Sequence, residues 1–210
     1  LSGIIAARSG VVPLVGPYRA KNPGDVLEWN RAVMRYIQEK KIANVILAAR
    51  WAVYVEGKPN GEINTLIGDA ESREISRDES KRVFEQHLAS TIKSLRQLGV
   101  RVWIMKQVPL QAHDPCRDYL ASALFQHSQI RPGVNLSEHR RQQEWVDNVF
   151  VDVRDYGVNL LDPAMCCFNA ENYSITGKDN VPYYADQDHL SPAGAEALLR
   201  PLFESVMTEI

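Results

Sequence analysis

Five segments of the chain repeat apolar residues every three or four positions, which is the pattern of an amphipathic helix. Residues that favour helix starts and stops flank these segments, including a Ser-x-x-Glu capping box at Ser76 and a proline at a first helical position. The first predicted helix begins at Asp25 and the last begins at Ser191-Pro192. The three between them cover Ser76 to Gly99, Asp114-Pro115 to about Gln129, and Ser137 to Gly157.

Short apolar runs lie between the predicted helices. A continuous apolar run is typical of a parallel strand that is buried on both faces. The turn Asn60-Gly61, between two strand-like runs, additionally predicts a β-hairpin. The predicted strands cover residues 2–7, 44–49, 100–109 and 158–163.

Strands that alternate with helices indicate an α/β fold, a three-layer α/β/α sandwich with a mainly parallel sheet. The 210 residues contain no internal repeat and no linker-like tract, so we expect residues 1–210 to form a single domain. In such sheets, ligands gather outside the carboxyl ends of the strands. The loops that follow Ala49, Gln107 and Leu161 are therefore the first places to look for a site.

Charge and composition exclude several classes of partner. The formal charge is -2, the sequence pI is about 6.2, and there is no basic run, so we expect no nucleic-acid partner.

No apolar run reaches the roughly 20 residues of a membrane-spanning helix, and the start lacks the pattern of a signal peptide. A flavodoxin-like nucleotide binder has no support, because no glycine-rich phosphate loop follows any strand. The chain begins with Leu, and we expect it to derive from a longer protein.

Neither the cysteines nor most of the histidines predict a metal site, because their spacing is not that of metal ligands. Two arrangements of the thiols stay open: one disulfide from Cys116 to Cys166 or Cys167, or three thiols. The histidines without a partner four residues away are His87, His113, His127 and His139.

The segment "DQDHLSPAGAEALL" combines candidate chemistry with a helix start. Asp186 lies three residues before His189, so a turn can bring its carboxylate to the imidazole, fix the tautomer and stabilise the imidazolium. Asp188 is a second candidate, ranked lower because neighbouring side chains usually diverge. The alternative is a helix cap formed by Ser191 that happens to contain a surface histidine.

Three segments resemble the SGNH hydrolase family, in particular the SGNH domains that are fused to acyltransferase-3 (AT3) membrane O-acyltransferases. "DQDHLSPAGA" is similar to the Asp-x-x-His-Leu-Ser block of the family, "NVILAARWAVY" to its third block in the fused domains, and "ARSGVVPLVG" to the segment after the first helix. The resemblance implies a flavodoxin-like SGNH fold in which His189 is the general base and Asp186 orients it. It also implies that Arg50 and Trp51 line the substrate pocket. The alternative is that Trp51 packs in the core and Arg50 forms a surface ion pair.

The family carries its serine nucleophile in a Gly-Asp-Ser-His block after the first strand, and these 210 residues contain no such block. Ser2 and Ser9 flank the first predicted strand, but neither lies in a Gly-Asp-Ser turn. We therefore expect the nucleophile in a segment outside this chain. The strand before that block is central in the family's sheet, so without it strand edges lack a partner.

The resemblance implies an ester hydrolase or O-acyl (acetyl) transferase domain that acts on a cell-surface glycan without metal or cofactor. Its partners would be an acylated small molecule or glycan and the acyltransferase membrane domain of the parent protein. Its location would be periplasmic or extracytoplasmic, on a bacterial inner-membrane protein. The alternative is a non-catalytic SGNH-like module that binds a glycan or a partner chain.

Overall fold

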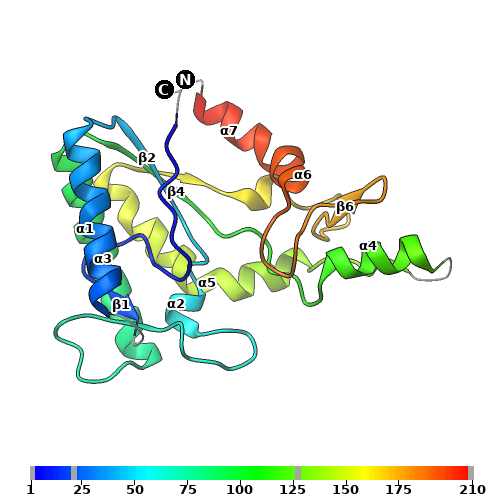
Figure 1. The fold of residues 1–210 in the computed structure, drawn as a ribbon, viewed down its shortest axis with the longest axis horizontal. Coiled ribbons are helices and arrows are strands. Elements are labelled where there is room, and N and C mark those ends of the chain that lie inside the picture. The colour runs from blue at the N-terminus through cyan, green and yellow to red at the C-terminus, as the bar shows by residue number, and fades with distance from the viewer. Residues whose placement is uncertain (1–2, 20–22, 126–128, 208–210) are drawn as a thin grey trace. The chain divides into compact units, whose positions relative to one another are not determined.

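The computed structural model describes residues 3–19, 23–125 and 129–207 of the chain. The chain divides into two compact units, and Figure 1 shows the labelled elements of both. The first unit comprises Leu1–Met105 and Trp145–Leu160, and the second comprises Lys106–Glu144 and Leu161–Ile210.

The first unit contains a parallel sheet. β2 (Asn44–Ala48) pairs in parallel with β4 (Arg101–Met105), and Asn44 lies opposite Arg101 (Figure 1). β5 (Val158–Leu161) is the third strand, and the strand order is β2-β4-β5. All three strands lie in segments where the sequence predicts them. The predicted α/β fold with a mainly parallel sheet is therefore confirmed.

The helix between β2 and β4 has the predicted ends. In α3 (Arg77–Gln97), the Ser76 hydroxyl accepts a hydrogen bond from the Glu79 N–H at 3.2 Å, and Gly99 follows the last turn with a φ of +78°. Glycine adopts this left-handed conformation without steric cost. The other elements of the first unit are β1 (Tyr18–Arg19), α1 (Pro23–Glu39), α2 (Val53–Glu56), β3 (Ile67–Gly68), the last part of α5 (Leu136–Asp152), and the 3-10 helix η1 (Val153–Tyr156).

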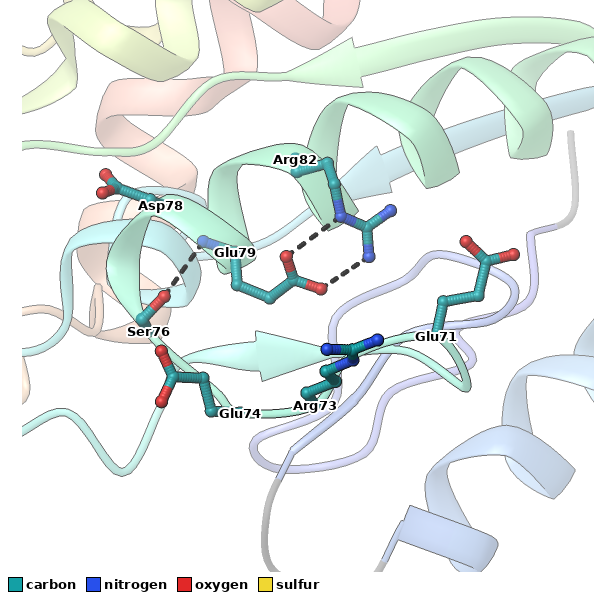
Figure 2. A pocket seen from close by; sticks show the side chains of 7 residues that line it. All are labelled: Glu71, Arg73, Glu74, Ser76, Asp78, Glu79 and Arg82. Atoms are coloured by element: carbon teal, nitrogen blue, oxygen red, sulfur yellow. Dashed lines mark hydrogen bonds and ion pairs between the residues drawn. The ribbon is translucent and has the colours of Figure 1, made fainter.

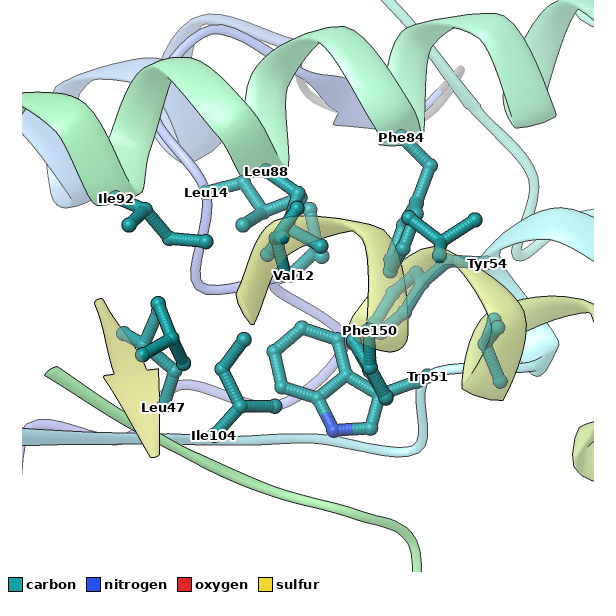
Figure 3. Packing of buried hydrophobic residues seen from close by; sticks show 14 of the residues in the cluster. Val12, Leu14, Leu47, Trp51, Tyr54, Phe84, Leu88, Ile92, Ile104 and Phe150 are labelled. Atoms are coloured by element: carbon teal, nitrogen blue, oxygen red, sulfur yellow. The ribbon is translucent and has the colours of Figure 1, made fainter. Parts of the chain in front are cut away.

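A large aromatic cluster lies at the centre of the first unit's core. The Trp51 ring meets Phe84 and Phe150 edge-on, with ring centroids 6.0 and 5.4 Å apart. Figure 3 shows these rings together with Leu47 of β2 and Ile104 of β4. Edge-to-face ring pairs stabilise a core by about 0.5–1.5 kcal/mol beyond the area that they bury. The sheet and the helices α3 and α5 therefore share one core.

Two predicted features of the N-terminal half are wrong. Residues 3–7 are not a strand, and Ile5 is 92% exposed. Among the described residues they have no neighbour to form a ladder, and a strand without a neighbour is not stable. The hairpin around Asn60-Gly61 is also absent: a turn forms there, but the preceding run is helix α2, and the following strand β3 pairs with β1 instead. Residues 1 and 2 lie outside the described residues.

Three helix ends differ from the prediction. α1 begins at Pro23, so Asp25 lies in its first turn instead of capping it. α4 (Pro115–Leu124) begins at the predicted position, where Asp114 caps it, but it ends before residue 129. At the start of α5, the cap is the Asn135 side chain, which accepts hydrogen bonds from the N–H and the hydroxyl of Ser137. Asparagine and serine are about equally good caps, so the sequence pattern did not separate them.

The second unit consists of short elements joined by long connections. Its three cysteines, Cys116, Cys166 and Cys167, are free thiols in the structure. No described helix is long and apolar enough to cross a membrane. The elements are α4, the first part of α5, η2 (Pro163–Met165), β6 (Gly177–Lys178), β7 (Val181–Pro182), α6 (Pro192–Gly194), the π-helical turn η3 (Ala195–Leu199) and α7 (Arg200–Met207).

A buried carboxylate ties the loop after β3 to α3. The Asp69 side chain is 5% exposed and lies 3.0 Å from Arg82 and 3.1 Å from Nε2 of His87. Burial works to raise the pKa of Asp69, but hydrogen bonds from His87, Ser72, the Glu71 N–H and Arg82 outweigh it and lower the pKa to about 2. The native state therefore favours the ionised form of Asp69.

We expect Asp69→Asn to lower the free energy of unfolding by about 2 kcal/mol at neutral pH, because one pKa unit corresponds to about 1.4 kcal/mol. The folded-state pKa of Asp69 lies below its ordinary value of 3.8, so this stabilisation is complete above about pH 4 and is lost as the pH falls through about 2. Urea unfolding of both proteins between pH 7 and pH 2 measures the difference.

Asp25→Asn is the matched control, because Asp25 is 62% exposed and its ion pair with Arg8 lies at the surface. Such a pair contributes less than about 1 kcal/mol. An equal loss in both variants, or a difference that does not change with pH, would contradict the role of Asp69.

Candidate functional site

The candidate site is a closed turn in the second unit, between β7 and α6. Tyr184 and Leu190 form an isolated antiparallel bridge, and the Ala185 N–H donates to the His189 carbonyl at 2.8 Å. Tyr184 is completely buried and anchors the start of the turn. Residues 185–189 therefore form a short loop with fixed ends.

Asp186 builds this turn with one of its carboxylate oxygens. Its Oδ1 accepts hydrogen bonds from the N–H groups of Asp188 and His189, at 2.9 and 2.8 Å. Aspartate commonly bonds to the backbone two or three residues ahead and so stabilises a turn. Asp186 thus fixes the direction of the chain at both residues that follow it.

The other oxygen of Asp186 reaches the imidazole of His189. Oδ2 lies 2.8 Å from Nδ1, within the expected hydrogen-bond reach. The His189 side chain is 66% exposed, so the ring is not buried against the core. Because a carboxylate can only accept, this contact places a proton on Nδ1 and leaves Nε2 as the basic nitrogen.

The surroundings of Asp186 keep it ionised. Burial works to raise the pKa of this carboxyl, but hydrogen bonds from the Asp188 N–H, the His189 ring and the His189 N–H hold the pKa well below its usual range. An ionised carboxylate can orient an imidazole and stabilise the imidazolium that forms when the ring takes a proton.

Asp186, Asp188 and His189 also offer one ligand atom each within 4.8 Å of one another. The geometry of the pair is that of an oriented base, because an Nδ1 that carries a proton toward a carboxylate has no lone pair to give to a metal. The expected absence of a metal stays a prediction.

The start of α6 holds the turn from the other side. The Ser191 hydroxyl donates to the Pro182 carbonyl at 2.8 Å and accepts from the Gly194 N–H at 3.1 Å. A Cβ at Gly194 would collide with the Tyr183 carbonyl, so only glycine allows this approach. The predicted Ser191 cap is therefore present together with the Asp186–His189 pair, and the two interpretations of the segment do not exclude each other.

A buried glutamine connects the turn to the interior of the second unit. The Gln111 N–H donates to the Gln187 carbonyl at the tip of the turn, at 2.8 Å. Its side-chain Oε1 accepts from the Val134 N–H and the Ser174 hydroxyl, both at 3.0 Å. Gln111 is 3% exposed, so it joins three segments of the chain without contact with water.

Arg50 and Trp51 belong to the first unit, directly after β2. Trp51 is 0% exposed, and its Nε1 donates to the Met105 carbonyl at 2.7 Å. This is the packing role that the sequence left open as the alternative for Trp51. Arg50 is half-buried. Burial raises the pKa of Tyr54, and the nearby charges of Arg19 and Arg50 partly oppose this shift. Arg50 stays a predicted substrate-binding residue.

A polar pocket of about 630 Å³ lies around the start of α3 in the first unit. Figure 2 shows Ser76 at the N-terminal cap of α3, and the ion pair of Glu79 with Arg82 in the wall of the pocket. Glu79 and Arg82 belong to the ion-pair network of Asp69. The pocket contains none of the residues that the sequence singled out for chemistry.

The chain belongs to the family of SGNH domains that are fused to AT3 domains. The family model for the SGNH domain (fused to AT3 domains) matches residues 1–205. This confirms the resemblance that the Asp-x-x-His-Leu-Ser and Ala-Arg-Trp segments indicated. A search of curated proteins found no match.

One solved structure shows the same fold at low sequence identity, and a second is similar over most of the chain. The periplasmic domain of a lipopolysaccharide acetyltransferase from Salmonella ser. Paratyphi A is 16% identical, with a TM-score of 0.63 over 93% of this chain and 68% of that chain. A GDSL-like lipase from Bacteroides thetaiotaomicron VPI-5482 is 11% identical, with a TM-score of 0.49 over 87% of this chain and 70% of that chain. The first of these likenesses supports the SGNH hydrolase fold.

Sequence reasoning found the pair His189 and Asp186 but underrated two neighbours. Asp188 was ranked second on the argument that adjacent side chains diverge, yet its Oδ1 lies 2.8 Å from His189 Nδ1. The signal was present in Asp-x-Asp-His, which offers two carboxylates to one ring when the backbone turns. Gln111 carried no signal, because its role depends on contacts with distant segments. Of the other candidates, Ser9 is exposed in a turn, and Ser2 and His127 lie outside the described residues.

We expect Gln111→Leu to lower the free energy of unfolding by about 2–4 kcal/mol. The substitution leaves the buried Val134 N–H and the Ser174 hydroxyl without their acceptor, and each unsatisfied buried group costs about 1–3 kcal/mol. Gln187→Leu is the matched control, because that side chain is exposed and its carbonyl is retained; it should change stability by less than about 0.5 kcal/mol. Equal unfolding midpoints in urea for the two variants would refute this role.

Proposed function

We propose that this chain is the ester hydrolase or O-acyl (acetyl) transferase domain of a bacterial membrane acyltransferase. His189 is the general base and acid, Asp186 orients it, and the serine nucleophile lies outside these 210 residues. The observation that carries the proposal is the 2.8 Å contact of an ionised carboxylate with Nδ1 of an exposed imidazole, in a chain of the SGNH family.

In the first half of the proposed reaction, His189 Nε2 takes the proton of the serine hydroxyl while the serine oxygen bonds to the acyl carbon. The imidazolium returns this proton to the leaving oxygen as the original ester bond breaks, which leaves an acyl-serine. In the second half, Nε2 takes a proton from water or from an acceptor hydroxyl, which attacks the acyl-serine. The proton then passes to the serine oxygen, and the product is a free acid or a new ester.

The proposed acceptor is a glycan of the cell surface, and the proposed location is periplasmic or extracytoplasmic. Fusion to AT3 domains in the family supports a membrane acyltransferase domain as the partner. The similar Salmonella domain is described as the periplasmic domain of a lipopolysaccharide acetyltransferase, which supports both the acetyl group and the glycan.

We expect His189→Ala to lower ester hydrolysis by the full-length protein at least about 100-fold, the usual contribution of a positioned acid-base group. The rate is measured with a small chromogenic acetate. The acetyl content of surface glycan from cells that carry each protein is the second readout. The variant should keep its unfolding free energy within about 1 kcal/mol, because the ring is exposed. Equal rates and equal glycan acetylation would favour the non-catalytic binding module instead.

Arg50 is proposed as a substrate-binding residue, because it occupies the Ala-Arg-Trp run after β2 and its guanidinium offers fixed N–H donors to an oxyanion or a sugar hydroxyl. Arg50→Lys keeps the charge but loses this planar set of donors. We expect kcat/KM for the acetate to fall about 10-fold or more. Arg35→Lys, on the exposed side of α1, should leave kcat/KM unchanged. If the two variants behave alike, Arg50 has no part in binding.

A further inference from the structure

Two carboxylates, not one, face the same nitrogen of His189. Asp186 Oδ2 and Asp188 Oδ1 each lie 2.8 Å from Nδ1. The Asp188 side chain is 12% exposed, whereas that of Asp186 is 49% exposed. Water and salt screen the less exposed charge less, so at equal distance Asp188 interacts with the ring at least as strongly as Asp186 does.

The two aspartates differ in their other contacts. Asp186 uses Oδ1 to bind the N–H groups of Asp188 and His189, so it shapes the turn as well as orienting the ring. Asp188 is held in place by this hydrogen bond to its own N–H. Its carboxylate is thus directed to the imidazole by the backbone that Asp186 fixes.

We propose that Asp188 is a second positioning residue for His189, which shares with Asp186 the work of holding the Nδ1–H tautomer and of stabilising the imidazolium. The inference deepens the proposed function and rests on it. The Nδ1 proton is directed to Asp186, and the Asp188 oxygen at the same distance accepts it after a small rotation of the ring, so the ring keeps its tautomer when one of the two is neutralised. Both negative charges face the cation that forms when Nε2 takes the proton of the nucleophile.

The test is a double-mutant cycle on kcat for the chromogenic acetate, in the full-length protein. Asp186→Asn and Asp188→Asn should each lower kcat about 10-fold, because the remaining carboxylate still orients the ring. The double variant should lose about 10⁴-fold, the effect of neutralising a sole orienting carboxylate. This loss exceeds the product of the two single effects. Asn at position 186 can keep its side-chain oxygen on the two N–H groups, so the turn is retained.

A second readout follows the tautomer itself and does not depend on activity. ¹⁵N NMR of the histidine-labelled full-length protein, with the His189 signal assigned by its loss in His189→Ala, should show a proton on Nδ1 in both single variants. Only the double variant should lose this preference. A residue that merely supports the fold would not move this signal. Asp179→Asn, in the exposed turn between β6 and β7, is the matched control and should change neither readout.

Two results would overturn the inference: Asp188→Asn with the kcat of the wild type while Asp186→Asn alone loses about 10⁴-fold, or loss of the Nδ1 proton in Asp186→Asn alone. Failure of the proposed function is a different result, in which His189→Ala hydrolyses the acetate as fast as the wild type. In that case the NMR readout still decides whether Asp188 shares the ring.

Discussion

The proton on His189 Nδ1 decides what this ring can do. An exposed histidine with no partner exchanges between two tautomers, and either nitrogen can be the base. Here two carboxylate oxygens 2.8 Å from Nδ1 favour one tautomer and leave Nε2 to serve as the base in the proposed reaction. The site chemistry therefore depends on a local turn that presents acceptors to one side of the ring.

That turn is held by contacts that have nothing to do with acyl transfer. Tyr184, at the start of the turn, is buried, and Ser191, at its end, caps α6. The Gln111 N–H donates to the Gln187 carbonyl at the tip of the turn. A catalytic group must stay within a fraction of an ångström of its productive position, and loops alone rarely achieve this. In this chain the Ser191 cap, the Tyr184–Leu190 bridge and the buried Gln111 N–H together fix the loop that carries the proposed base.

The sequence predicted the features that arise from local patterns. The Ser76 cap, the end of α3 before Gly99 and the Asp186–His189 contact each depend on residues within a few positions of one another. The sequence did not predict the features that depend on partners far away along the chain. Residues 3–7 have the composition of a strand but no ladder partner among the described residues, and β3 pairs with β1 instead of forming the hairpin at Asn60. Local propensity is a weak guide where pairing decides the structure.

The two aspartates also explain why a motif with one named carboxylate understates this site. Oδ1 of Asp186 accepts from the backbone and Oδ2 lies nearest to the ring, so a substitution that removes both oxygens disturbs folding and chemistry together. Asp188 has the same distance to Nδ1 and is less exposed. The Asp186 side chain accepts from the backbone of Asp188 and His189 and so bends the chain. In this turn the Asp188 side chain comes close to the His189 ring, whereas in an extended chain the two side chains would point to opposite sides. The second carboxylate is thus a consequence of the same hydrogen bonds that orient the first.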